Sequence, residues 1–142
     1  MIEDNPGDVL LLRMALEDIG LAAELAVCGD GESAISRIEA TPAPDGVLLD
    51  LNVPCRDGLE VLQLLRATAG WETVPVMVLT GSMSKHDREQ VAGLGAEYFQ
   101  KPHGYSGFLD IAARIGAKLE QRPARRHRDR DEGALTGSDV SR

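Results

Sequence analysis

Five polar side chains stand directly after short, mostly apolar runs of the sequence: Glu3, Asp4, Asp50, Thr80 and Lys101. The three carboxylates, if brought together, would repel one another and raise one another's pKa. A hard divalent cation relieves such repulsion, and ligands that are all oxygen favour Mg²⁺ over softer metals. A lysine and a threonine hydroxyl nearby suit the oxygens of a transferred phosphoryl group. Asp50 beside the metal could then act as a carboxylate nucleophile, which is phospho-acceptor chemistry.

Alternating helices and strands are predicted to position these side chains. Helical spacing of apolar residues, with capping and terminating residues, predicts helices at about 6–19, 31–40, 59–65, 84–93 and 108–119. Short apolar runs predict strands at about 24–28, 46–51, 74–79 and 96–100. This alternation indicates an α/β fold with right-handed crossovers and a doubly wound parallel sheet. The working crevice of such a sheet lies beyond the carboxyl ends of its strands, where the five polar side chains fall.

Composition excludes several classes of protein. The 142 residues are 43% hydrophobic and 27% charged, as in an ordinary soluble domain. A net charge of −8 disfavours general nucleic-acid binding, and we expect no DNA-binding domain. Six carboxylates within the first 25 residues argue against a signal peptide, and the apolar runs are too short to span a membrane. Cys28 and Cys55 are too few for a disulfide scaffold, so we expect a cytoplasmic protein.

The distribution of charge predicts the domain boundary. The last 22 residues hold six arginines and four acids but few apolar side chains. Such a segment cannot bury enough surface to offset the entropy of ordering it. We therefore predict one domain at residues 1–119 and a flexible charged tail at 120–142.

Four motifs, in order along the chain, resemble those of the response-regulator receiver domains of two-component signalling. They are Glu3-Asp4-Asn5-Pro6, Asp50 within Leu-Leu-Asp-Leu-Asn-Val-Pro-Cys-Arg-Asp-Gly, Thr80 within Val-Leu-Thr-Gly-Ser, and Lys101-Pro102. The first and second motifs look most like those of the small single-domain regulators found with bacteriophytochrome-type sensor kinases. The resemblance implies a flavodoxin-like sheet of five parallel strands in the order 2-1-3-4-5.

The first strand of that sheet is predicted to be largely missing. Receiver domains have a full strand ahead of the acidic pair, at the centre of the sheet, and only Met1 and Ile2 stand there in this chain. A strand usually has about five residues. We interpret the difference as a shortened chain or a start codon assigned too far downstream, and we expect an open core with Glu3 and Asp4 weakly anchored.

The resemblance implies a role for each matching residue. Asp50 would be the phosphorylated aspartate, and Mg²⁺ would be bound by Glu3, Asp4, Asp50 and the backbone carbonyl of Asn52, whose side chain would be free to tune hydrolysis. Thr80 would move toward the phosphoryl group, Gly81 would let a backbone N–H approach it, and Lys101 would pair with its oxygens. Tyr98 would report the position of Thr80, and the Lys101–Pro102 peptide bond would be cis.

The leading interpretation is a receiver that takes its phosphoryl group from a sensor histidine kinase or a phosphotransfer protein and switches a docking surface for a downstream protein target. It would be no enzyme beyond catalysing its own phosphorylation and dephosphorylation, and the resemblance allows a homodimer. Two alternatives stay open. One is a pseudo-receiver, an interaction module that is never phosphorylated. The other is an aspartyl-phosphate phosphohydrolase, which needs a second aspartate where this chain has Asn52.

Overall fold

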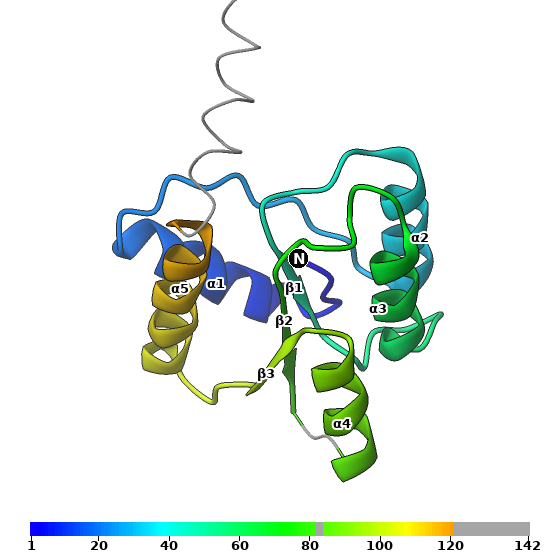
Figure 1. The fold of residues 1–142 in the computed structure, drawn as a ribbon. Coiled ribbons are helices and arrows are strands. Elements are labelled where there is room, and N and C mark those ends of the chain that lie inside the picture. The colour runs from blue at the N-terminus through cyan, green and yellow to red at the C-terminus, as the bar shows by residue number, and fades with distance from the viewer. Residues whose placement is uncertain (82–83, 121–142) are drawn as a thin grey trace, which may run out of the picture.

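The computed structural model describes residues 1–81 and 84–120 as a parallel sheet with helices on both faces (Figure 1). In chain order the elements are α1 (Pro6–Asp18), α2 (Gly31–Ala40), β1 (Val47–Leu49), α3 (Gly58–Ala67), β2 (Val76–Thr80), α4 (Lys85–Gly93), β3 (Glu97–Gln100) and α5 (Tyr105–Glu120). None of these helices is long and apolar enough to cross a membrane. The predicted tail lies outside the described residues except for Glu120, which ends α5 and belongs to the domain.

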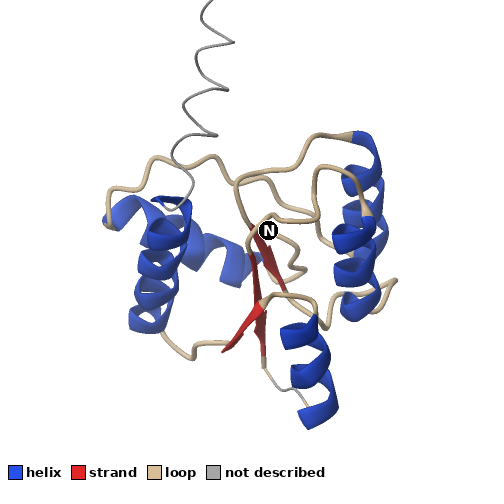
Figure 2. Cartoon of the chain, in the orientation of Figure 1, coloured by secondary structure: helices blue, strands red, loops and turns tan. Residues whose placement is uncertain are grey.

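The three strands form one sheet in the order β1-β2-β3, and both pairs are parallel (Figure 2). All five residues of β2 are buried, because helices cover both faces of this central strand. Helices α1 and α5 pack together on one side, while α2 and α3 pack on the other and α4 lies beside β3. The alternation read from the sequence therefore produces the predicted doubly wound α/β fold.

Two single-residue bridges extend the sheet beyond β1. Ile2 pairs in parallel with both Leu49 and Cys28, so the order across the sheet is Cys28, Ile2, β1, β2, β3. This order matches the predicted 2-1-3-4-5, but the strand predicted at 24–28 is wrong in extent, since only Cys28 is paired. The physical reason is that the neighbouring segment, Met1 to Glu3, is short. An extended segment stays in a sheet only where a partner strand supplies backbone hydrogen bonds, and Met1 to Glu3 supply few.

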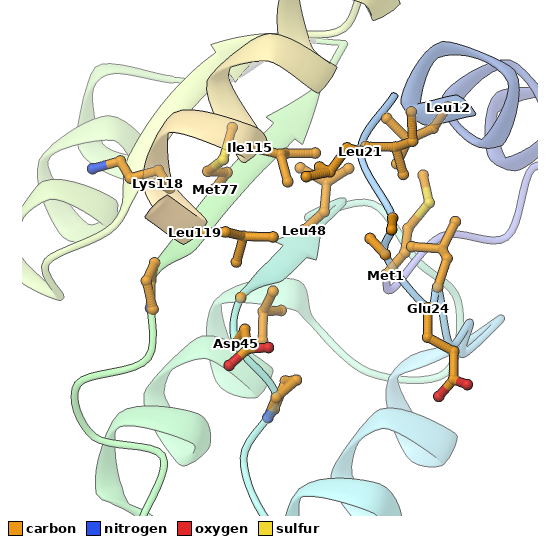
Figure 3. A pocket seen from close by; sticks show the side chains of 18 residues that line it. Met1, Leu12, Leu21, Glu24, Asp45, Leu48, Met77, Ile115, Lys118 and Leu119 are labelled. Carbon is orange, nitrogen blue, oxygen red and sulfur yellow. The ribbon is translucent and has the colours of Figure 1, made fainter. Parts of the chain in front are cut away.

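The core is hollow on both faces beside β1. On the side of α1 and α5, a cavity of about 500 Å³ is lined by Met1, Leu48, Met77, Ile115 and other residues (Figure 3). On the side of α2, a second cavity of about 370 Å³ is also lined by Met1. The open core expected next to the first-strand position is therefore present, and it lies at the end of the sheet opposite the polar strand ends.

Ion pairs from Glu97 tie β3 to α5. Its carboxylate oxygens lie 2.6 Å from Arg114 Nη2 and 2.9 Å from Lys118 Nζ. Hydrogen bonds from Lys118 and Arg114 hold the pKa of Glu97 below its ordinary value of 4.5. Because the folded-state pKa is lowered, this contribution to stability is present above pH 4.5 and is lost as the pH falls through the lowered value.

We expect Glu97→Gln to lower the free energy of unfolding by about 0.5–1 kcal/mol at pH 7, the range of partly exposed ion pairs. The deficit should shrink as the pH falls below 4.5 and through the lowered pKa of Glu97. Urea unfolding followed by circular dichroism at a series of pH values measures both. An equal deficit at every pH would show that Glu97 acts through packing and not through its charge.

Candidate functional site

The carboxyl ends of the strands bring the predicted polar residues together. Asp50 follows β1, Thr80 ends β2, and Lys101 follows β3. The backbone N–H of Asp50 donates to the carbonyl of Ile2 at 3.0 Å, and that of Lys101 donates to the carbonyl of Thr80 at 2.9 Å. Glu3 is fixed in the same way, since its N–H donates to the carbonyl of Cys28 at 2.9 Å. These backbone hydrogen bonds fix the positions from which the side chains project. Because the strands are parallel, their carboxyl ends lie at one edge of the sheet, and the side chains meet there.

Glu3, Asp4 and Asp50 form an acidic triplet. Each offers one carboxylate oxygen, and these oxygens all lie within 4.8 Å of one another. Glu3 and Asp50 are buried and Asp4 is exposed. Burial raises the pKa of Glu3 and the charge of Asp50 raises it further, while the hydrogen bond from Lys101 lowers it. An all-oxygen cluster that opens to solvent at Asp4 fits a hard divalent cation such as Mg²⁺ or Mn²⁺.

Lys101 is surrounded by carboxylates. Its Nζ lies 2.9 Å from Asp50 Oδ2, 3.0 Å from Glu3 Oε1 and 3.0 Å from Asp8 Oδ2. Burial by itself lowers the pKa of Lys101, but hydrogen bonds to the three carboxylates outweigh that effect and raise the pKa above its ordinary value. The site therefore keeps a positive charge on Lys101 next to Asp50.

Asp8 is a site residue that the sequence did not single out. It lies in the first turn of α1, which Asn5 caps by accepting hydrogen bonds at Oδ1 from the N–H groups of Gly7 and Asp8. The available signal was its place in the sequence: Asp8 is an acidic residue in the first turn of the helix that Asn5 and Pro6 open, a few residues after the Glu3-Asp4 pair.

Asn52 holds Thr80 as well as Asp50. Its backbone N–H donates to Asp50 Oδ1 at 2.9 Å, and its side-chain Nδ2 donates to Thr80 Oγ1 at 2.8 Å. The side chain that the resemblance left free to tune hydrolysis thus contacts Thr80. The turn after Asp50 folds Asn52 back over the end of β2, and Thr80 is fully buried there, so its hydroxyl needs a partner within the protein.

The loop after Asp50 depends on a glycine. The N–H of Gly58 donates to the carbonyl of Leu51 at 3.2 Å. A Cβ at position 58 would lie 2.4 Å from Leu51 Cα, a distance that real Cβ atoms do not adopt. The first turn of α3 thus packs directly against the backbone next to Asp50, and no larger residue fits there without moving that backbone.

The remaining predicted residues lie around this centre. Gly81 is exposed directly after β2, and Tyr98 is half-buried on β3, packed against the core on the α2 and α3 side. The Lys101–Pro102 peptide bond is trans, so the predicted cis bond is wrong. The trans form is favoured before proline by about 0.5–1 kcal/mol. Pro102 lies against Gly107, where a Cβ would be only 2.4 Å from Pro102 Cβ, so the glycine makes room for the ring in this geometry.

Comparison with known proteins gives consistent matches. The family described as "Response regulator receiver domain" matches residues 1–111. Transcriptional regulatory protein KdpE of Mycobacterium tuberculosis is 36% identical over 125 residues, which are 87% of this chain and 51% of KdpE. The chain therefore spans about half the length of this curated relative.

Two solved structures match most of the chain. The phosphorylated cyanobacterial phytochrome response regulator RcpA has a TM-score of 0.71 and 30% identity, covering 80% of this chain and 86% of that one. The Mn²⁺-bound form of response regulator Rcp1 has a TM-score of 0.71 and 29% identity, covering 80% and 87%.

Proposed function

The chain belongs to the response regulator receiver domains, the phospho-accepting domains of two-component signalling, and we propose that its acceptor atom is a carboxylate oxygen of Asp50. One observation carries the assignment: Asp50 directly follows β1 and lies inside the acidic triplet, with Lys101 Nζ 2.9 Å from its Oδ2. The nucleophile, a charged lysine and a set of oxygen ligands thus meet at one point.

The proposed chemistry is phosphoryl transfer from a phosphohistidine. An Asp50 oxygen forms a bond to phosphorus while the bond between phosphorus and the donor's imidazole nitrogen breaks, and the electron pair leaves with the imidazole. Lys101 balances the negative charge of the arriving phosphoryl oxygens. Glu3, Asp4, Asp50 and the backbone carbonyl of Asn52 would hold the divalent cation. When bound, Mg²⁺ would add positive charge beside the same oxygens.

Thr80 would couple phosphorylation to a change of shape. Its hydroxyl accepts a hydrogen bond from Asn52, so a move toward a phosphoryl group on Asp50 must break that bond. The phosphoryl oxygens would have to offer the hydroxyl a better partner, which makes the switch a biased two-state equilibrium. Tyr98, half-buried on the neighbouring strand, would respond to that move.

We expect Asn52→Ala to favour the rearranged position of Thr80. A hydrogen bond of this kind stabilises by about 0.5–1.5 kcal/mol, so its loss should raise the population of the rearranged state by roughly two- to tenfold. Chemical shifts of the Thr80 methyl group in the unphosphorylated variant should move toward those of the phosphorylated parent. Shifts that stay at the unphosphorylated position would show that the Asn52 bond does not restrain Thr80.

The experiment that tests the proposed function is intact mass after incubation with acetyl phosphate and Mg²⁺. We expect a gain of one phosphoryl group, and no gain when the divalent cation is chelated. No gain in a sample that circular dichroism shows to be folded would contradict the proposal. It would favour the pseudo-receiver, an interaction module that is never phosphorylated.

The wider assignment follows from the same chemistry. A sensor histidine kinase or a phosphotransfer protein would supply the phosphoryl group, and a protein target would recognise the switched surface, in the cytoplasm. The chain would perform no turnover chemistry beyond its own phosphorylation and dephosphorylation. Purified candidate kinases, loaded with labelled phosphate, would identify the donor by rapid transfer to this chain.

A further inference from the structure

The three carboxylates around Lys101 differ in what else they can do. Glu3 and Asp50 belong to the acidic triplet, whereas Asp8 does not. Asp8 Oδ2 is nevertheless as close to Lys101 Nζ as Glu3 Oε1 is, at 3.0 Å. Asp8 is thus the one partner of Lys101, among the residues described, with no place in the candidate cation site.

The contact between Asp8 and Lys101 is shielded from solvent. The side chains are 17% and 21% exposed, so this is not a surface ion pair whose energy water removes. Asp8 is also held in place, because it lies in the first turn of α1 and its N–H donates to the capping Asn5 side chain at 3.3 Å. A carboxylate fixed in this way can define the position of a flexible lysine ammonium.

A divalent cation on the triplet would change the surroundings of Lys101. It would draw on the charge of Glu3 and Asp50, the same carboxylates that hold the ammonium, and it would repel that ammonium at short range. Asp8 would keep its contact with Lys101, because that contact does not use an oxygen of the triplet. The negative charge of Asp8 would offset part of the repulsion between the cation and the ammonium.

We propose that Asp8 is a positioning residue that keeps the Lys101 ammonium beside Asp50 when a divalent cation occupies the triplet. It acts through Lys101 and touches neither the cation nor the phosphoryl group. This inference rests on the proposed function of Asp50, and it adds a determinant of cation affinity that lies outside the ligand set. Removing a group that holds a metal ligand typically lowers metal affinity by about 10- to 100-fold, and Asp8 lies one contact further out, so we expect the lower end of that range.

A double-mutant cycle with Lys101 tests the inference on the unphosphorylated protein. The parent, Asp8→Asn, Lys101→Met and the double variant are titrated with Mg²⁺ by calorimetry at pH 7. We expect Asp8→Asn to weaken Mg²⁺ binding by about tenfold in the parent and by less than about twofold in the Lys101→Met background. Glu17→Gln, which removes the same charge from an exposed position on α1, is the matched control and should change the affinity little.

The alternatives give different results. If Asp8 were itself a cation ligand, Asp8→Asn would weaken binding equally in both backgrounds, which would overturn the proposal. An unchanged affinity in the parent background would overturn it too. Circular dichroism checks folding, and Asp8→Ser, which also suits the first turn of a helix, replaces Asp8→Asn if that variant unfolds. Because Mg²⁺ affinity is measured without phosphorylation, failure here is distinguishable from a failure of Asp50 to accept a phosphoryl group.

Discussion

Asp50→Asn is expected to abolish the mass gain of one phosphoryl group that acetyl phosphate and Mg²⁺ produce in the parent chain. The amide of asparagine has the shape of the carboxylate but no anionic oxygen, so it cannot form the acyl phosphate. The substitution also removes one of the three charges of the acidic triplet, and we expect the fold to persist because crowding of carboxylates decreases. The loss of labelling should therefore occur in a folded protein.

Asp110→Asn is the matched control for this experiment. Asp110 is an exposed aspartate on α5, outside the acidic triplet, and its replacement should leave the mass gain unchanged. A phosphoryl group on folded Asp50→Asn would refute the assignment of the acceptor. Peptide mapping would then show whether Asp4, the exposed member of the triplet, accepts the group.

Lys101→Met should cause the largest loss of stability among the site variants. It leaves Glu3 and Asp50, whose side chains are 2% and 6% exposed, without their shared cation. Removing one partner of a buried ion pair costs about 3–5 kcal/mol, and we expect about 3 kcal/mol because Lys101 itself is partly exposed. Urea unfolding with a chelator present measures this loss, and Lys85→Met at an exposed position on α4 is the control.

The loss of unfolding free energy in Lys101→Met should change with pH and with Mg²⁺. Burial raises the pKa of Glu3 above 4.5 in the folded state, so the stability linked to its protonation is fully present below pH 4.5 and is lost as the pH rises through the raised value. Without Lys101 that rise is larger, and the deficit should be smallest below pH 4.5 and greatest at neutral pH. Adding Mg²⁺ at pH 7 should recover part of the lost stability, because the cation replaces the missing positive charge. A loss of stability that changes with neither pH nor Mg²⁺ would mean that Lys101 stabilises by packing alone.

The two variants separate chemistry from electrostatic support. Asp50→Asn should lose labelling with little loss of stability, whereas Lys101→Met should lose stability when no divalent cation is present. Lys101→Met should still accept some phosphoryl group in Mg²⁺, since its nucleophile is intact. Equal behaviour of the two variants in both measurements would contradict the roles assigned to these residues.

Local patterns in the sequence are enough to predict the order of the elements and the residues at the strand ends. Apolar runs such as 76–80 are local signals of buried strands, and helical spacing is a local signal of helices. Once the strands are parallel, their carboxyl ends must share one edge. The meeting of Asp50, Thr80 and Lys101, which are about 30 and 20 residues apart in the chain, can therefore be predicted before any contact between them is known.

The contacts between side chains at that edge could not be predicted from local patterns. Asp8 reaches Lys101 across 93 positions, and Asn52 takes the hydroxyl of Thr80 across 28. Residues 24–28 have strand-like composition, yet only Cys28 pairs, because the segment Met1 to Glu3 beside them is too short to pair with the other residues. A pattern of residue types records what a segment can do locally. Hydrogen bonds and ion pairs between distant segments depend on the relative placement of whole elements, which packing of the core fixes and local sequence does not.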